Sequence, residues 1–258
     1  MKKTLITLLF ANLVFGLFAQ RYHGFSFPYK AEIKTIEFKV LDINYDKNIV
    51  AFKHVYEALE YFFMGEEGEV LQKPIDCSYA GMESYPTAGV VLGMYDLAKG
   101  EYLKTFTVYE SCYELEDCYS HELSVQKLDS AKQLFKDYGM TIEKCPNPIF
   151  FKKETNGTSS VTLDGIKFTS SFQNDRDNMA TVSTLYSNGT LLFTESFFDN
   201  FIMASHGEVL HTAAYRDGNK IVFLSKFYHT NNMEGVESWE FFHLSPVFVI
   251  MGDQVVQE

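Results

Sequence analysis

Residues 161–172 of this 258-residue chain have the sequence VTLDGIKFTSSF. The pair Asp164-Gly165 separates two runs in which apolar and polar side chains alternate, the period-two pattern of half-buried strands. Asp-Gly favours a type I′ turn, in which both central residues adopt positive φ and the turn joins two antiparallel strands. Asn188-Gly189 and Asp217-Gly218 repeat this signal further along the chain. Together the three turns predict an antiparallel β-meander.

The meander is expected to fill residues 149–258. Later strands are predicted at 209–215, 220–228, 238–244 and 247–251. Pro146 and Pro148 lie just before this segment and mark a plausible boundary.

The preceding segment, 20–148, is predicted to mix strands with two helices. Strands are expected at 36–40, 89–95 and 102–109. The first helix, which Gly65 can end, is indicated by apolar residues at helical spacing: Val55, Ala58, Leu59 and Phe62. The second, which Asp129 or Ser130 can cap and Gly139 can end, is indicated by Ala131, Leu134, Phe135 and Tyr138.

The predicted fold class is therefore α+β, predominantly antiparallel β. Four adjacent phenylalanine pairs bear on how the two segments meet: Phe62-Phe63, Phe150-Phe151, Phe197-Phe198 and Phe241-Phe242. In a strand, the two rings of such a pair point to opposite faces. Either a second layer covers the outer rings, in which case the segments form one continuous sandwich, or the rings form an exposed patch that marks a binding surface.

Residues 1–19 are predicted to be a secretory signal peptide. Lys2 and Lys3 precede an uncharged, mostly apolar run from Thr4 to Phe18, and Ala19 offers a small residue at the cleavage point. The run is too short to span a bilayer, which needs about 20 residues. Since the rest of the chain has no stretch of 18 uninterrupted apolar residues, we expect a secreted or periplasmic protein that is not integral to a membrane.

The composition describes an acidic, aromatic-rich globular chain. Asp and Glu outnumber Lys and Arg by 34 to 22, which gives a formal net charge of −12, and 16% of the residues are aromatic. A surface this negative repels phosphate backbones, so nucleic acid is not expected as a partner.

Four cysteines, Cys77, Cys112, Cys118 and Cys145, all lie before the meander. An even number in an exported chain favours two disulfides. We predict Cys112 with Cys118 and Cys77 with Cys145. A zinc site at Cys112, Cys118 and His121 is the alternative, but its spacing does not match a zinc knuckle.

Histidines in the meander are the main candidates for chemistry: His206, His211, His229 and His243. A histidine beside a carboxylate makes an acid–base site, for which Asp217 and Glu240 are the candidate partners. The competing interpretation is four unrelated histidines at strand ends.

Two acidic stretches are weak candidates for calcium. The first comprises Glu114, Glu116 and Asp117, and the second contains Asp175 and Asp177. Neither has the residue order of an EF-hand, and solvated turns explain both equally well. No cofactor is predicted.

No familiar catalytic motif is present, since the chain lacks G-x-S-x-G, H-E-x-x-H and both glycine-rich phosphate-binding patterns. We therefore expect a non-catalytic binding module for a small ligand, a glycan or a protein. One alternative is an exported hydrolase or metal-dependent enzyme that uses the C-terminal histidines. Another is a structural or assembly component of the cell envelope.

Overall fold

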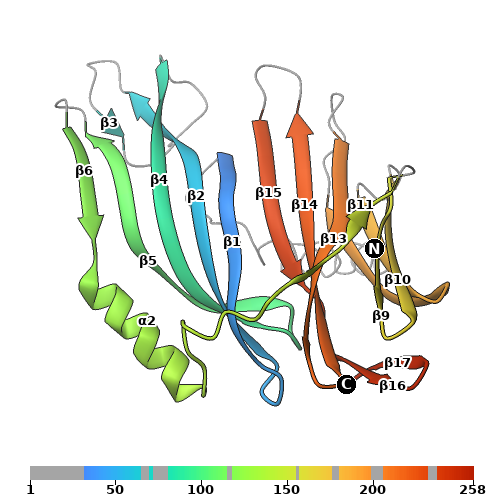
Figure 1. Cartoon of the computed structure of the whole chain (residues 1–258). Helices are drawn as coiled ribbons and strands as arrows, with labels where there is room; N and C mark the ends of the chain where they lie inside the picture. Colours follow the sequence, from blue (N-terminus) through green and yellow to red (C-terminus); the bar gives the residue numbers. More distant parts are fainter. Residues whose placement is uncertain are drawn as a thin grey trace, which may run out of the picture.

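The computed structural model describes residues 32–64, 70–71, 81–114, 118–154, 157–175, 180–198, 206–231 and 237–258. The described part is mostly antiparallel β with one helix, arranged as a twelve-stranded and a five-stranded sheet (Figure 1). The predominantly antiparallel β prediction is confirmed. The predicted signal peptide, residues 1–19, lies outside the described residues.

The first half of the large sheet is built from strands that are neighbours in sequence. They are β1 (Glu32–Asn44), β2 (Ile49–Met64), β3 (Val70–Leu71), β4 (Gly81–Asp96), β5 (Glu101–Glu114) and β6 (Cys118–Leu123). Strands β1, β2, β4, β5 and β6 pair in that order, each antiparallel to the next, and β3 pairs with β2.

The second half of the large sheet comes from the other end of the chain. Its strands are β7 (Ile149–Phe150), β13 (His206–Asp217), β14 (Lys220–Asn231), β15 (Glu237–Leu244), β16 (Phe248–Met251) and β17 (Gln254–Gln257). Strand β14 lies between β13 and β15, and β15 joins β1 through a parallel pairing of Ile33 with Trp239. This contact makes the two halves one sheet.

The small sheet is a continuous excursion of the chain between β7 and β13. It contains β8 (Lys152–Lys153), β9 (Ser159–Leu163), β10 (Ile166–Asp175), β11 (Ala180–Ser187) and β12 (Thr190–Phe198) in sequence order. The Asp164-Gly165 and Asn188-Gly189 turns have positive φ at both positions, as a type I′ turn requires. In the third hairpin Asp217 pairs with Lys220, so the turn is Gly218-Asn219, one residue later than predicted.

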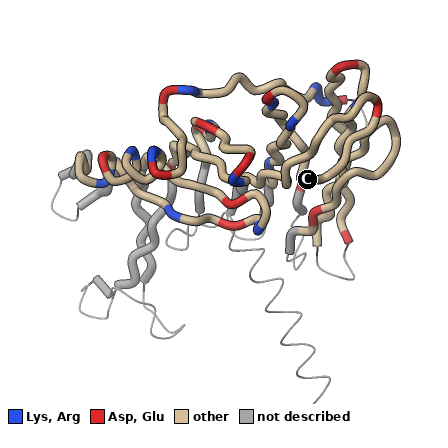
Figure 2. Tube along the Cα trace, turned by 90° about the horizontal axis from the view of Figure 1, so that it is seen from below, with Lys and Arg blue, Asp and Glu red and all other residues tan. Residues whose placement is uncertain are grey.

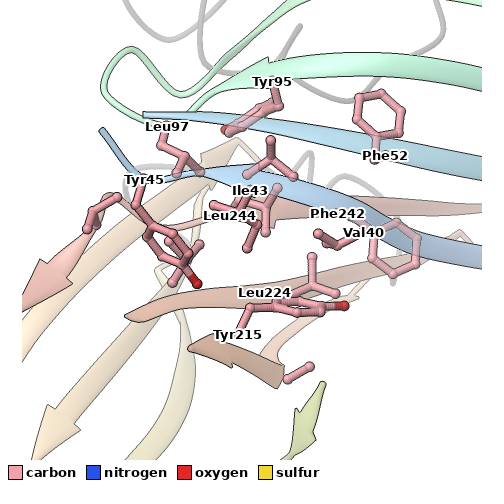
Figure 3. Close-up of a cluster of buried hydrophobic side chains, with 14 of the residues drawn as sticks. Val40, Ile43, Tyr45, Phe52, Tyr95, Leu97, Tyr215, Leu224, Phe242 and Leu244 are labelled. Carbon is pink, nitrogen blue, oxygen red and sulfur yellow. The ribbon is translucent and has the colours of Figure 1, made fainter. Parts of the chain in front are cut away.

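Three apolar clusters hold the layers together. The largest joins Val40 and Phe52 of the first half to Tyr215 and Leu244 of the second (Figure 3). A second cluster packs the helix α2 (Val125–Asp137) against the opposite face of β1, β2 and β4. A third packs the small sheet onto β13, β14 and β16. The single continuous sandwich of the two segments does not form, because both segments contribute strands to one large sheet, on which the small sheet and α2 pack.

The first predicted helix is wrong, because residues 55–62 belong to strand β2, which pairs with β1 on one side and β4 on the other. Its inward face is formed by Phe52, His54 and Tyr56, which are all buried. The polar residue type of His54 interrupts the apolar side of the period-two pattern that a strand shows. The helical spacing from Val55 onward is coincidental.

The second predicted helix is confirmed as α2, although it begins earlier than expected. Ser124 caps it by accepting a hydrogen bond from the Lys127 amide at 3.3 Å, in place of Asp129 or Ser130. Ala131 and Phe135 face the sheet and are fully buried. Gly139 follows the helix with a φ of 74°, the left-handed conformation that ends many helices.

Charged residues of the described part lie along turns and the helix, with both signs interspersed (Figure 2). Examples are Lys220 with Asp46 and Glu258, and Arg216 with Asp164. No helix among the described residues is long and apolar enough to cross a membrane.

Candidate functional site

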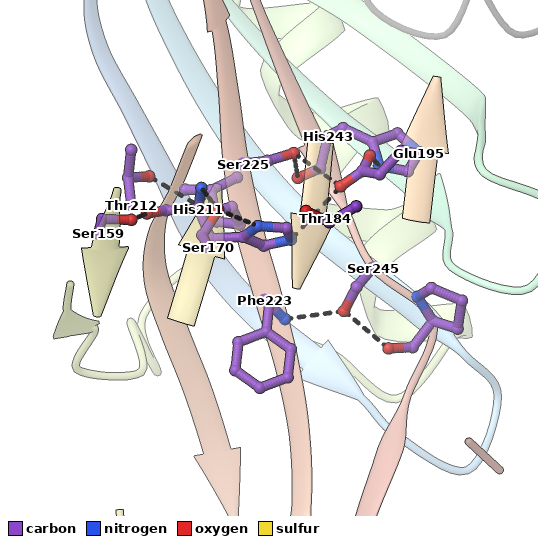
Figure 4. A network of polar contacts seen from close by, with 12 residues as sticks. Ser159, Ser170, Thr184, Glu195, His211, Thr212, Phe223, Ser225, His243 and Ser245 are labelled. Carbon is purple, nitrogen blue, oxygen red and sulfur yellow. Dashed lines mark hydrogen bonds and ion pairs between the residues drawn. The ribbon is translucent and has the colours of Figure 1, made fainter. Parts of the chain in front are cut away.

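A buried carboxylate, Glu195, lies where the small sheet meets the large one (Figure 4). It projects from β12 and is only 6% exposed. Three side chains from three neighbouring strands of the large sheet surround it: His211 from β13, Ser225 from β14 and His243 from β15. We call these four residues the Glu195 array.

Both carboxylate oxygens of Glu195 lie against side chains of the large sheet. Oε1 accepts a hydrogen bond from the Ser225 hydroxyl at 3.2 Å and lies 3.4 Å from His211 Nε2. Oε2 contacts His243 Nδ1. A buried carboxylate needs such partners, because an unpaired charge in a protein interior costs several kcal/mol.

His211 is fixed from the opposite side by the small sheet. The Ser170 hydroxyl on β10 lies 2.9 Å from His211 Nδ1 and also accepts from the His211 amide at 3.0 Å. Ser159 on β9 donates to the His211 carbonyl at 2.8 Å. With His211 only 1% exposed, the ring has no freedom to turn.

The electrostatics of the array favour an ionised Glu195. Burial alone raises the pKa of Glu195, but the charge of His243 and hydrogen bonds from His211 and His243 outweigh burial and hold the pKa well below its usual range. Tyr95 stands edge-on to the His243 ring, 5.9 Å between centroids. Burial, together with the charge of Glu195, raises the pKa of the Tyr95 phenol well above its usual value.

The array opens on one side into a small pocket. Its volume is about 140 Å³, and it is bounded by loop 97–100 between β4 and β5, residues 193–196 of β12, His243 and Pro246. His243 is 20% exposed, whereas Glu195 behind it is almost completely covered. The imidazole of His243 is therefore more accessible from the pocket than the carboxylate of Glu195.

A wider groove of about 1110 Å³ runs between α2 and strands β4 and β5. Its walls are mostly apolar, with Asp129 and Asp137 on the helix side and Lys104 on the strand side. The groove lacks the converging titratable groups of the pocket at His243.

The structure brings together two of the four predicted histidines, His211 and His243. Asp217 is not their partner, since it closes the β13–β14 hairpin opposite Lys220. The backbones of His206 and His229 pair with Thr230 and Gly207, respectively. The side chains of His206, His229 and Glu240 lie outside the described part.

Glu195 was missed by sequence reasoning, although a signal for it exists. In the run TLLFTESFF of β12 it shares the strand parity of Phe193, a residue packed in the third cluster. A carboxylate on the apolar side of a strand has to be paired, and the unassigned histidines of the neighbouring strands offer such a pairing.

No disulfide is observed among the described side chains. Cys145 is a free thiol that donates weakly to the Ile142 carbonyl at 3.5 Å, so its predicted bond to Cys77 is not formed, and Cys77 itself lies outside the described residues. The backbone register places Cys112 opposite Ser120 and Cys118 opposite Glu114, a diagonal rather than a direct pairing. The side chains of Cys112 and Cys118 lie outside the described part.

The predicted calcium stretches fall largely outside the described ranges. Glu116, Asp117 and Asp177 are not described, nor is the side chain of Glu114, and Asp175 ends β10. No group of three or more His, Cys, Asp or Glu side chains within the described ranges is arranged to hold a metal ion.

No protein-family model, curated protein or solved structure matches the chain.

Proposed function

We propose that this chain is an exported binding protein that takes a small polar ligand into the pocket at His243. The observation that carries the proposal is the Glu195 array, in which a buried carboxylate forms ion-pair contacts with two histidines, one of them partly exposed at a concave site. A concave site with a few converging polar groups is typical of small-ligand binding. Export is supported by Lys2 and Lys3 ahead of an apolar run.

Thermal unfolding in the presence of small polar compounds tests this proposal. A ligand at 100 times its dissociation constant stabilises the folded chain by about 2.7 kcal/mol, which raises the melting temperature by several degrees. His243→Gln should remove the shift. His54→Gln is the matched control, since His54 is also buried but contacts Thr35, away from the pocket. Equal shifts in both variants would place the ligand elsewhere.

Acid–base catalysis is a second candidate function, favoured by the contact between His243 Nδ1 and the carboxylate of Glu195. A carboxylate in this position orients an imidazole and stabilises its charged form, which is how hydrolases prepare a histidine base. A panel of chromogenic esters and glycosides tests it. Turnover that His243→Gln abolishes and His54→Gln preserves would favour an enzyme over a binding protein.

A further inference from the structure

Strand β12 lies at one end of the small sheet. It pairs with β11 on one side, and no strand in the described part of the chain pairs with its other side. A strand in this position presents a row of backbone N–H and C=O groups that have no partner within the sheet. Such a row can recognise an extended peptide, which adds to the sheet as a further strand.

The pocket at His243 runs along this free edge. Its lining includes four consecutive residues of β12, Phe193 to Ser196. Successive side chains of a strand point to opposite faces, so a pocket on one face of the sheet contacts alternate residues only. A pocket that contacts four residues in a row therefore lies at an edge of the strand. The other edge of β12 is covered by β11.

The hydrogen bonds of the small sheet show which way the backbone of β11 faces. At the end of this strand the Asn188 amide donates to the Lys167 carbonyl at 2.8 Å, so the backbone at this position faces β10. Along an antiparallel strand the direction alternates from one residue to the next. The N–H and C=O groups of Ser183 and Leu185 therefore face β12.

The same alternation shows which residues of β12 face the free edge. The partners of Ser183 and Leu185 are Glu195 and Phe193, respectively, so Glu195 and Phe193 direct their backbone groups toward β11. Thr194, between them, directs its N–H and C=O groups the opposite way, and so does Ser196. The pocket is therefore bordered by free backbone donors and acceptors of these two residues.

This pattern matches the backbone of an extended peptide. A strand that adds to an edge offers N–H and C=O groups in the complementary order and at the same spacing. The pocket volume of about 140 Å³ corresponds to about five water molecules at roughly 30 Å³ each. Such a space suits one residue with a small side chain, while the rest of the peptide continues along β12.

The charges beside the pocket favour a cationic peptide. Lys99 lines the pocket, and its Nζ lies 3.5 Å from both Asp96 and Glu101, so two carboxylates accompany one ammonium group in this loop. The chain as a whole carries a formal net charge of −12. A negative potential of this kind attracts cationic ligands and repels anionic ones.

We infer that the pocket binds one residue of a short cationic peptide, which pairs in an extended conformation with the free edge of β12 at Thr194 and Ser196. This inference rests on the proposed function and specifies its ligand class. Affinity comes from main-chain hydrogen bonds, and the loop that contains Lys99 closes the far side of the site.

Amide hydrogen exchange, followed by NMR, tests the edge before any ligand is added. We expect slow exchange at Phe193 and Glu195, whose N–H groups bond to β11, and fast exchange at Thr194 and Ser196. Slow exchange at all four amides would overturn the inference, because the edge would then be covered.

Peptide binding is measured on the same sample with a pool of blocked tripeptides that have lysine at the centre and alanine, valine or threonine on either side. We expect this lysine pool to shift the amide resonances of Thr194 and Ser196 in a saturable way and to slow their exchange. A matched pool with N-methylated amides cannot pair with an edge and should cause neither effect. A third pool, with glutamate at the centre, should bind at least ten times more weakly. Equal binding of either control pool would overturn the inference.

Failure of this inference is distinguishable from failure of the proposed function. Small polar compounds could raise the melting temperature in a way that His243→Gln removes, while the lysine pool does not bind. The peptide inference would then be wrong and the proposed binding function would stand. If neither the compounds nor the peptides bind, both are wrong.

Variants at the free edge separate backbone pairing from side-chain contacts. Thr194→Pro removes a free N–H without removing a hydrogen bond to β11, and proline is tolerated on edge strands for this reason. We expect the affinity for the lysine pool to fall roughly tenfold. Thr194→Val is the matched control, since it keeps the N–H and loses only the hydroxyl, and it should bind like the unmodified protein. Ser196→Pro repeats the test at the second free N–H. Equal affinity in Thr194→Pro and Thr194→Val would contradict pairing at this edge.

Discussion

His54 is a neutral core histidine, and its environment makes the stability of the protein depend on pH. It is 3% exposed, its ring lies among Phe38, Tyr56 and Phe242, and burial lowers its pKa from 6.5 to about 4. Below pH 6.5 the unfolded chain therefore binds a proton at His54 that the folded chain does not bind. Stability is fully present above that pH and falls as the pH drops toward 4.

We predict that the free energy of unfolding falls by about 3 kcal/mol between pH 7 and pH 4 on account of His54 alone. Urea denaturation at a series of pH values measures this slope. In His54→Gln the part of the slope that His54 contributes between pH 6.5 and 4 should disappear. An unchanged slope in that variant would show that another group is responsible.

Among the polar side chains, Glu195 is expected to contribute most to the free energy of unfolding. Glu195→Ala leaves His211 and His243 without their shared acceptor in a buried site, which typically costs 3–5 kcal/mol, whereas Glu195→Gln keeps the shape and should cost less. Chemical denaturation at pH 7 compares the two. Because the folded-state pKa of Glu195 is depressed, its contribution is present above the ordinary carboxyl range and is lost as the pH falls below it. A cost below 1 kcal/mol for the alanine variant would mean that the array adds little to stability.

The residues of the candidate site were only partly predictable from the sequence. Histidine is recognisable by type, so the amino-acid sequence alone marks His211 and His243 as candidates. Their partner was not predictable, because Glu195 reaches them across the interface between two sheets, and no local spacing encodes that contact. The predicted partners Asp217 and Glu240 were closer in sequence but belong to a hairpin end and to a strand whose side chains are not described.

Among the elements, α2 offers a direct test of where a helix begins. Ser124→Ala removes the acceptor for the Lys127 amide and should cost about 1 kcal/mol. Ser130→Ala is the matched control, since Ser130 lies inside the helix and its hydroxyl donates to the Gln126 carbonyl, a bond that adds little. Thermal unfolding distinguishes the two. A larger effect at Ser130 would contradict the observed start of the helix.

The elements that sequence reasoning predicted correctly are those specified by local chemistry. Asp164-Gly165 and Asn188-Gly189 demand positive φ, and that demand alone fixes two hairpins. Strand β2 was mistaken for a helix because its identity depends on what covers it. Phe52 and Tyr56 are buried in the cluster that strands β13, β14 and β15 complete, and these strands lie far away in sequence.

At the scale of the whole molecule, the largest apolar cluster belongs equally to both ends of the chain. It joins strands β1, β2 and β4 to β13, β14 and β15, so neither half can bury its inner face alone. We therefore predict a single cooperative unfolding transition in differential scanning calorimetry, with equal calorimetric and van't Hoff enthalpies. Two resolved transitions, or an isolated fragment 20–148 that folds by itself, would contradict this prediction.

The parallel contact between β1 and β15 predicts an order in which the parts of the sheet form. Hairpins such as β4–β5 are expected to form early, because each of them closes only a short loop. The pairing of Ile33 with Trp239 joins residues that are separated by nearly the entire described chain. Closing so long a loop costs conformational entropy before any stabilising contact forms, so we expect this pairing to form late. The pocket spans this late junction, with loop 97–100 on one side and His243 on the other. If the pocket binds a ligand as proposed, we expect binding only after the junction between β1 and β15 has formed.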